Sequence, residues 1–324
     1  MTAMRRLTIL AAVLGLAACA GGSTTLVRPW QGAEPGWTAA AAENRPVGLG
    51  LSGGAVLAEG VSFAGGVEIS LTPDSPLHSL SDLKLTGEGG FISVTDTGDL
   101  VRGSLRLDKR GRLTGVDGLR WRRLTLRDGS PIVEKPDGDA EGLAFTHAGE
   151  LLVSFERDHR IWNYGRAAPA ARPVPATMPT HPFTTNDGIE AMAASSRGWR
   201  VAGESGGVWD CDGHDCIVVT PPPQTPLTDS DYRMTGLDED PRGEGWFVVQ
   251  RSFAPPVDAR ARVRRMSPDG ALGPVLIELK LPGTTDNFEG VAAERRGEGT
   301  RLYILSDDNG NPLQRTLLLA FDIR

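Results

Sequence analysis

The sequence has almost none of the signals that indicate α-helices. After the first 20 residues, no segment of 11 or more positions places its apolar side chains at the 3.6-residue spacing of an amphipathic helix. This absence argues against helical bundles and α/β folds. Instead, 41 glycines and 23 prolines separate short apolar stretches, which is typical of strands joined by turns. The sequence therefore predicts an all-β chain.

Motifs that identify several common enzyme classes are also missing. There is no Gly-x-Ser-x-Gly nucleophile elbow, no phosphate-binding loop and no dinucleotide-binding fingerprint. Lysine is scarce, and the 34 basic side chains are outnumbered by 41 aspartates and glutamates. This balance argues against nucleic acid as a partner. The acidic side chains are therefore the first place to look for chemistry.

One pattern recurs five times: an opening that usually carries an acidic residue and a glycine, a short apolar strand, a turn, and a second strand. The clearest copy begins at Asp286-Asn287-Phe288-Glu289-Gly290. One residue from each copy is taken as equivalent, namely Asp82, Glu141, Glu190, Gly236 and Glu289. They are separated by 59, 49, 46 and 53 residues, and a step near 50 with about four strands per unit is typical of a β-propeller.

The repeat predicts an all-β propeller of about five to six four-stranded blades over residues 46–324. Five copies are visible, and residues 65–71 paired with residues 315–323 would complete a sixth blade and close the ring. A β-sandwich is the alternative, since it also uses short strands and turns. It would not, however, repeat the same opening at five nearly even intervals.

The first 18 residues have the pattern of an export signal. Met1–Arg6 is positively charged, and residues 7–18 are apolar but too short to span a bilayer comfortably. Cys19 follows directly and matches the bacterial lipoprotein cleavage box, so we expect it to carry lipid that anchors the chain. An ordinary signal peptide is the alternative.

Residues 19–45 are predicted to form a lipidated flexible tether, because they are rich in Gly, Ala, Ser and Thr. Ala20 favours the outer membrane, with the protein facing the periplasm. Without residues 1–18 the formal net charge is −9, from 32 basic and 41 acidic side chains. This charge gives no general attraction to anionic lipid, so we expect membrane contact through the lipid anchor only.

The two remaining cysteines, Cys211 and Cys216, flank an Asp-Gly turn between apolar stretches. This pattern indicates a hairpin whose cysteines face each other. In an oxidising periplasm we expect them to form a disulfide. A zinc site that also uses His214 is the alternative.

The acidic residues of the repeat are expected to gather at one mouth of a central channel, which the innermost strands of a propeller line. Carboxylate and amide oxygens without His or Cys suit a hard cation, with Ca²⁺ first and Mg²⁺ second. The predicted metal ligands are Asp82, Glu141, Glu190, Asp286, Asn287, Glu289, Asp307 and Asp308. The alternative is that these residues only form turns at the strand starts.

Arginines follow the second strand of several copies, at Arg157, Arg251 and Arg315. Near a cation-bearing mouth they could bind phosphate oxygens in a bidentate manner. The alternative is that they form ion pairs with the same carboxylates and brace neighbouring blades.

Several segments resemble the phytase-like family, also called "esterase-like activity of phytase". They are Asp139–Ala144, Val153–Arg157, His159–Ile161, Asn186–Ala191, Asp286–Gly290, Ser306–Asn309 and Gln314–Leu318. The resemblance covers about residues 55–324. It implies a β-propeller and, by analogy with phytases, calcium-dependent hydrolysis of phosphoric monoesters.

This resemblance suggests roles for individual residues. Glu141, Glu190 and Glu289 would hold the metal at the catalytic centre, and the three arginines would bind the phosphoryl group. We expect a monomer that acts on a small anionic ester. The alternatives are a propeller that binds a ligand or partner without catalysis, and a propeller lactonase or carboxylic esterase.

Overall fold

The structure is a computed structural model that describes residues 36–71, 75, 77–166, 172–254 and 258–324. Within these ranges the chain is almost entirely β-structure, and the one helix, α1 (Lys135–Gly138), is a single turn long. No helix among the described residues has the length and apolarity needed to cross a membrane.

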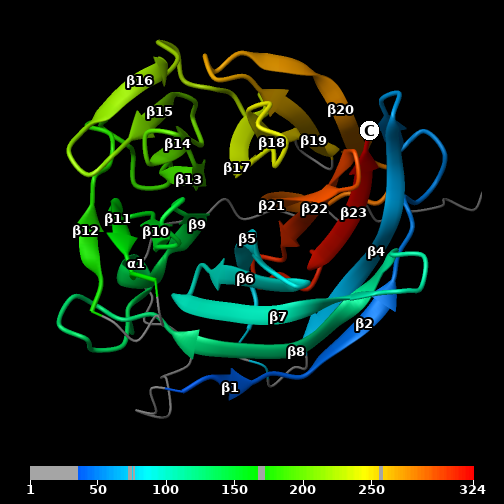
Figure 1. Cartoon of the computed structure of the whole chain (residues 1–324), viewed down its shortest axis with the longest axis horizontal. Coiled ribbons are helices and arrows are strands. Elements are labelled where there is room, and N and C mark those ends of the chain that lie inside the picture. The colour runs from blue at the N-terminus through cyan, green and yellow to red at the C-terminus, as the bar shows by residue number, and fades with distance from the viewer. Residues whose placement is uncertain (1–35, 72–74, 76, 167–171, 255–257) are drawn as a thin grey trace, which may run out of the picture.

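The strands form five four-stranded antiparallel blades around a common centre, as in a propeller, and the first and last blades are joined into one ten-stranded sheet (Figure 1). Blade 1 contains β5 (Leu80–Gly87), β6 (Gly90–Thr95), β7 (Asp99–Leu107) and β8 (Leu113–Arg123). Blade 2 contains β9 (Ala140–Phe145), β10 (Leu151–Phe155), β11 (Arg160–Asn163) and β12 (Val174–Ala176). Blade 3 contains β13 (Ile189–Ala194), β14 (Trp199–Gly203), β15 (Val208–Cys211) and β16 (Cys216–Thr220).

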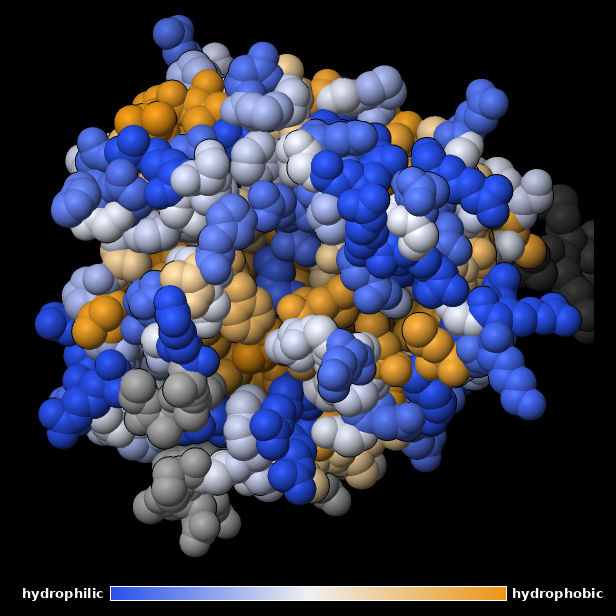
Figure 2. All heavy atoms as spheres, in the orientation of Figure 1, coloured by the Kyte–Doolittle hydropathy of each residue, from blue (hydrophilic) through white to orange (hydrophobic). Residues whose placement is uncertain are grey.

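Blades 4 and 5 each include a strand from the beginning of the propeller, which is a fifth strand in blade 4 and the fourth strand in blade 5. Blade 4 contains β17 (Arg233–Glu239), β18 (Trp246–Ala254), β19 (Asp258–Met266) and β20 (Leu272–Lys280), with β3 (Ala55–Leu57) added outside. Blade 5 contains β21 (Asn287–Arg296), β22 (Gly299–Asp307), β23 (Leu317–Ile323) and β4 (Val61–Leu71). The first strands of the five blades, β5, β9, β13, β17 and β21, contact one another in a ring. Figure 2 shows a hollow at the centre of the ring, with hydrophilic residues inside it.

Strand β4 closes the ring by pairing with β23, the last strand of the chain. The predicted pairing of residues 65–71 with the chain end is therefore present, but it completes the fifth blade and not a sixth. β4 also meets blade 1 where Gly65 pairs with Leu113. A Cβ on Gly65 would lie 2.3 Å from the Leu113 carbonyl oxygen, so this close approach requires glycine.

The propeller begins earlier than the sequence predicts. β1 (Thr38–Ala39) pairs with β8, and β2 (Ala42–Pro46) pairs with β4. The predicted tether boundary at residue 45 therefore falls inside a strand, because residues 38–46 add hydrogen-bonded edges to two blades. The predicted signal peptide, residues 1–18, and Cys19 lie outside the described residues.

The core is divided into five apolar clusters, one between each pair of neighbouring blades. The cluster between blades 1 and 2, for example, contains Val94 and Leu143, both 0% exposed. Because each blade is covered on both faces, a middle strand such as β10 is buried along its whole length. Burying one such side chain stabilises by about 1.5 to 3 kcal/mol, so packing between the blades holds the ring together.

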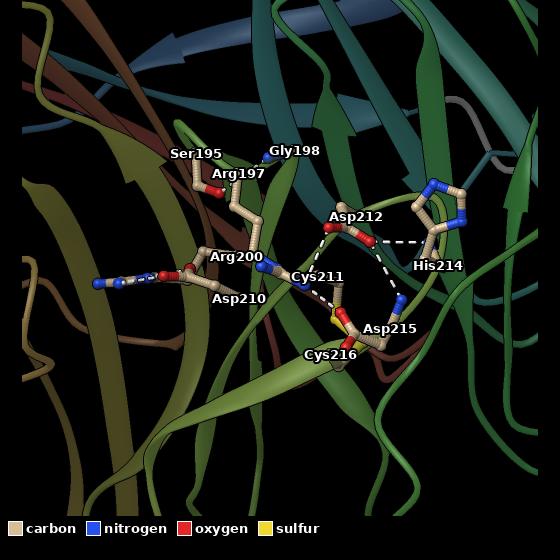
Figure 3. The surroundings of a disulfide bond; sticks show 10 residues. All are labelled: Ser195, Arg197, Gly198, Arg200, Asp210, Cys211, Asp212, His214, Asp215 and Cys216. Atoms are coloured by element: carbon tan, nitrogen blue, oxygen red, sulfur yellow. Dashed lines mark hydrogen bonds and ion pairs between the residues drawn. A yellow bond between two sulfur atoms is a disulfide. The ribbon is translucent and has the colours of Figure 1, made fainter.

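Cys211 and Cys216 lie opposite each other on β15 and β16 and form a disulfide (Figure 3). In the turn between them, Asp212 Oδ1 accepts hydrogen bonds from the backbone N–H groups of His214 and Asp215. The His214 residue is exposed. Among the described residues, no group of three potential metal ligands includes it.

Candidate functional site

A β-bulge interrupts the pairing of each innermost strand near its start. In β9, for example, Ala140 pairs with Phe155 and Gly142 with Ser154, so that Glu141 is left unpaired between them. The same irregularity occurs in the other four blades. The five unpaired residues are Ser81, Glu141, Glu190, Thr235 and Glu289. The bulges thus place one polar side chain from each blade at an equivalent position.

These bulges correct the alignment of the repeat by one residue in two blades. The structural equivalent of Glu141 is Ser81 in blade 1, not Asp82, and Thr235 in blade 4, not Gly236. The glycine of the motif is needed for a different reason, because its backbone packs against the next blade. A Cβ on Gly236 would lie 2.1 Å from the Glu289 carbonyl oxygen.

A second equivalent set lies at or near the end of the second strand of each blade. In each blade, one residue of the second strand pairs with the innermost strand just before the bulge, and the member of this set is the next residue. In blade 2, for example, Phe155 pairs with Ala140, and Glu156 follows Phe155. The five residues are Asp96, Glu156, Glu204, Arg251 and Asp307. Asp96, Glu156 and Glu204 were not predicted as site residues, although the acid at this position in four of the five blades was a signal that could have found them.

The charged residues of the two sets, together with Asp139, form a strongly acidic region that we call the acidic mouth. It consists of Asp96, Asp139, Glu141, Glu156, Glu190, Glu204, Glu289, Asp307 and Arg251. Oxygens of Asp139, Glu141 and Glu156 lie within 4.8 Å of one another, and so do oxygens of Glu156, Glu190 and Glu204. Glu156 belongs to both groups, so it joins blade 2 to blade 3 within the site.

Burial and nearby carboxylates raise the pKa values of Asp96, Glu141, Glu156, Glu190, Glu289 and Asp307. Burial is the main cause for Glu289, whose pKa rises to about 7, and for Glu156, whose pKa rises to about 8. The pKa values of Glu141, Glu190 and Asp307 lie well above their ordinary values, first through burial and then through neighbouring carboxylates. Such a cluster favours either bound protons or a cation near neutral pH.

Arg251 is the basic member of the two equivalent sets. Its Nη2 atom lies 3.2 Å from Glu204 Oε1 and 3.5 Å from Glu289 Oε1. Burial alone would lower the pKa of Arg251, but Glu289, Glu204 and Glu190 raise it above its ordinary value. One guanidinium therefore bridges blades 3 and 5 across the site.

Glu289 has an oxygen that no hydrogen bond satisfies. The Nδ2 group of Asn287 donates to Glu289 Oε1 at 2.7 Å, whereas Oε2 is buried without a hydrogen-bond partner. The residue is only 4% exposed. A buried carboxylate oxygen in this state is costly unless a proton or cation reaches it.

Two predicted metal ligands are instead occupied by backbone and side-chain donors. Asp308 accepts hydrogen bonds from Ser79 N at 2.9 Å, Gly310 N at 3.0 Å and Thr316 Oγ1 at 2.8 Å. Asp286 accepts from the backbone N–H groups of Asn287 and Arg315 and from Arg315 Nε. Both residues therefore hold loops in place, as the turn alternative expects.

The other two predicted arginines also pair with carboxylates. Arg157 Nε donates to Asp139 Oδ2, and Arg315 Nε lies 3.3 Å from Asp286 Oδ2. Asp139 also pairs with Lys135, which bonds Asp96 at 2.7 Å. Lys135 and the three arginines thus all form ion pairs with carboxylates.

Residues 75–310 match the family described as "Phytase-like: Esterase-like activity of phytase". The chain belongs to the phytase-like family. The match covers all five innermost strands and the whole acidic mouth, which agrees with the resemblance in the sequence. No curated protein is similar enough to this phytase-like propeller to match it.

Several solved structures share only a distant similarity with the phytase-like propeller. A candidate gluconolactonase is 14% identical at a TM-score of 0.43 and covers 87% of this chain and 93% of its own. The Malassezia sympodialis allergen Mala s 1 is 13% identical at 0.42, covering 80% and 87%. The PQQ-bound aldose sugar dehydrogenase of Streptomyces coelicolor is 10% identical at 0.39, covering 87% and 100%. Similarities this low support no statement on activity.

Asp82 does not lie among the acids of the mouth in the phytase-like propeller. It is fully buried, with its oxygens 2.8 and 2.9 Å from Lys84 Nζ, and its Oδ2 accepts from Leu143 N of blade 2 at 2.8 Å. Lys84 also donates to the Val291 carbonyl of blade 5. Burial raises the pKa of Asp82 to about 6, and Lys84 opposes this rise.

This ion pair has a structural explanation. The innermost strand of each blade exposes unpaired backbone groups along its edge, and these groups need partners. Asp82 and Lys84 supply partners for blades 2 and 5, and Asp238 does the same for Ala293 N at 2.7 Å. Asp82 is therefore a brace between blades.

We expect Lys84→Met to destabilise the protein by about 3 to 5 kcal/mol, because it leaves the Asp82 carboxylate buried without its partner. Chemical denaturation at pH 8 measures this change. The double variant Asp82→Asn/Lys84→Met removes both charges and should recover much of the loss. Equal stability of the single variant and the wild type would contradict the assignment of the pair as a brace.

Proposed function

We propose that this phytase-like propeller is a metal-dependent hydrolase of phosphoric esters, with Ca²⁺ as the first candidate metal. The observation that carries the proposal is the pair of three-carboxylate groups that share Glu156, each with oxygens within 4.8 Å. Family membership supports an ester hydrolase in general, since the family is described by esterase-like activity.

The residues present fit a hard divalent cation. Both groups offer carboxylate oxygens only, which suits Ca²⁺ or Mg²⁺ better than a metal that prefers nitrogen or sulfur. The buried, unpartnered Oε2 of Glu289 provides a further oxygen in the same region. Glu156, Glu190 and Glu204 would hold one ion. Asp139, Glu141 and Glu156 would hold another in place of the bonds that Asp139 makes to Lys135 and Arg157.

The chain's own residues would bind the ester and handle the proton. A bound divalent cation neutralises phosphate charge and lowers the pKa of a coordinated water. Arg251 would donate to phosphoryl oxygens in place of its bond to Glu204. Glu289, with a pKa of about 7, can hold or release a proton near neutral pH.

A carboxylic esterase or lactonase is the second candidate function. All three predicted arginines are already paired with carboxylates: Arg157 with Asp139, Arg315 with Asp286, and Arg251 with Glu204 and Glu289. A carboxylic ester or lactone needs less positive charge at the site than a phosphate does, so this pairing favours the second candidate. A propeller that only binds a ligand is the non-catalytic alternative.

We further propose that the protein is a monomeric lipoprotein of the cell envelope, anchored through Cys19 and facing the periplasm, with a small anionic ester as its ligand. The charged and apolar pattern of residues 1–18 supports export. The disulfide between Cys211 and Cys216 is consistent with an oxidising compartment.

The activity is tested with 4-nitrophenyl phosphate, phytate, 4-nitrophenyl acetate and a γ-lactone, each with Ca²⁺ and with a chelator. We expect turnover of the phosphates that the chelator removes. Glu289→Gln should reduce it by about a hundredfold, because the proton-holding carboxyl is lost. Glu59→Gln makes the same chemical change at an exposed residue and should have no effect.

Melting curves of both variants establish that they are folded. Turnover of the acetate or lactone alone would select the second candidate. If no ester is hydrolysed with Ca²⁺ present, the enzymatic proposal is wrong.

A further inference from the structure

A cluster of aromatic side chains lies between blades 2 and 3, and we call it the aromatic rim. It consists of His159, His181, Phe183 and Trp209. The ring centroids of His181 and Phe183 are 4.8 Å apart at an interplanar angle of 80°. Phe183 also lies 5.5 Å from His159 and 6.0 Å from Trp209. These edge-to-face and tilted contacts join the four rings into one cluster.

The aromatic rim packs directly against the residues that carry two acids of the mouth. A Cβ on Gly188 would lie 3.2 Å from His159 Nδ1 and 3.3 Å from Glu156 Cγ. Glu204 N donates to the Gly188 carbonyl at 3.1 Å. A Cβ on Gly203 would lie 3.2 Å from Phe183 Cε1. The rim is therefore adjacent to the carboxylate group that Glu156, Glu190 and Glu204 form.

The aromatic rim has one buried ring and three rings that are partly exposed to solvent. Trp209 is buried, whereas His159, His181 and Phe183 are half-buried. His159 is held in place because its Nε2 donates to the Thr184 carbonyl at 2.7 Å. Aromatic rings in this position can contact a further ring without a large loss of side-chain freedom.

We propose that the aromatic rim is the subsite for the leaving group of the ester and that it binds a planar aromatic ring. This inference rests on the proposed function, because it takes the acidic mouth as the place of the ester group. Arg251 approaches the mouth from blade 4, and the rim lies across blades 2 and 3. An ester whose charged end faces Arg251 and the carboxylate groups therefore has the rim available for its alcohol portion.

The test measures binding, so that it does not depend on turnover. Phenylphosphonate, cyclohexylphosphonate and methylphosphonate are titrated calorimetrically into the full protein with Ca²⁺ present. We expect phenylphosphonate to bind about 3 to 10 times more tightly than the other two, as aromatic contacts of this kind imply. Phe183→Leu and, as a second variant, His181→Leu should each remove this preference.

Phe63→Leu is the matched control. Phe63 is also half-buried and contacts an aromatic ring edge-on, but it lies on β4 at the outside of blade 5. This variant should keep the preference for phenylphosphonate. Melting curves show whether each variant is folded.

The outcomes separate the two proposals. A retained aromatic preference without hydrolysis of any ester supports the rim and overturns the proposed activity. Equal binding of phenylphosphonate and methylphosphonate, or no binding of either, overturns the rim as a subsite. Equal binding of the phenyl and cyclohexyl ligands overturns its selectivity for aromatic rings, and so does a preference that persists in both rim variants.

Discussion

Calcium is expected to raise the melting temperature of the wild-type protein, and Glu156→Gln is expected to abolish most of this rise. Glu156 contributes an oxygen to both carboxylate groups of the acidic mouth, so one substitution weakens both. Calcium at 100 times its dissociation constant stabilises by about 2.7 kcal/mol through mass action. Glu156→Gln should therefore lose about this much of the stabilisation by calcium. Calorimetric titration should show that the variant binds calcium at least about a hundredfold more weakly than the wild type.

The same variant should behave in the opposite way without metal. Glu156 is 8% exposed and lies beside Asp139 and Glu204, which together with burial raise its pKa. At about pH 9, where this carboxyl is charged in the wild type, a neutral amide removes the repulsion, so Glu156→Gln should melt at a higher temperature than the wild type in chelator.

The control is Glu59→Gln, which removes one negative charge at an exposed position. It should leave both the calcium response and the melting temperature in chelator unchanged. An unchanged calcium response in Glu156→Gln would show that the ion binds elsewhere. A wild-type melting temperature that is the same in calcium and in chelator would contradict a metal site in the mouth altogether.

Without divalent cations, stability is expected to fall as the pH rises from about 5 to about 9. The pKa values of Glu289 and Glu156 are raised in the folded protein to about 7 and about 8, above their ordinary value of 4.5. At pH 5 the folded state keeps these protons. At pH 9 both carboxyls are charged and repel their neighbours, whereas the unfolded chain has already lost the protons at either pH above 4.5. For Glu289 alone, this linkage amounts to about 3 kcal/mol.

Calcium should flatten or reverse this dependence, because it binds the deprotonated carboxylates and displaces their protons. Chemical denaturation at pH 5, 7 and 9, with calcium and with chelator, measures both effects. Glu289→Gln should reduce the slope in chelator. Constant stability between pH 5 and pH 9 in chelator would contradict the raised pKa values of the acidic mouth.

The repeat in the sequence predicted the propeller because each blade must present the same features to the same surroundings. An apolar strand that is covered on both faces and a glycine against the neighbouring blade recur, and their spacing is visible without a structure. The pairing that closes the ring was also predicted, since a strand near residues 65–71 had to find a partner at the chain end.

The sequence placed the site residues less accurately, for a reason that lies in the bulges. A strand alternates its side chains with a period of two, so a bulge of one residue moves every later side chain to the other face. This shift turns Glu141 and Glu289 toward the mouth and leaves Asp82 one position further along, where it pairs with Lys84. The aligned letters do not show which residue of a strand is bulged.

The sequence by itself determined the fold class, the acidic character of the repeated strand starts and the family to which they belong. These features depend on local composition and on its period. Only the tertiary structure decided which acids meet, because that depends on strands from different blades. It brings Glu156 and Glu204 beside Glu190, uses Asp286 and Asp308 to hold loops, and pairs Arg251 with Glu204. Glu156 and Glu190 come from different blades, and so do Arg251 and Glu204, so the ring of five blades decides that they meet.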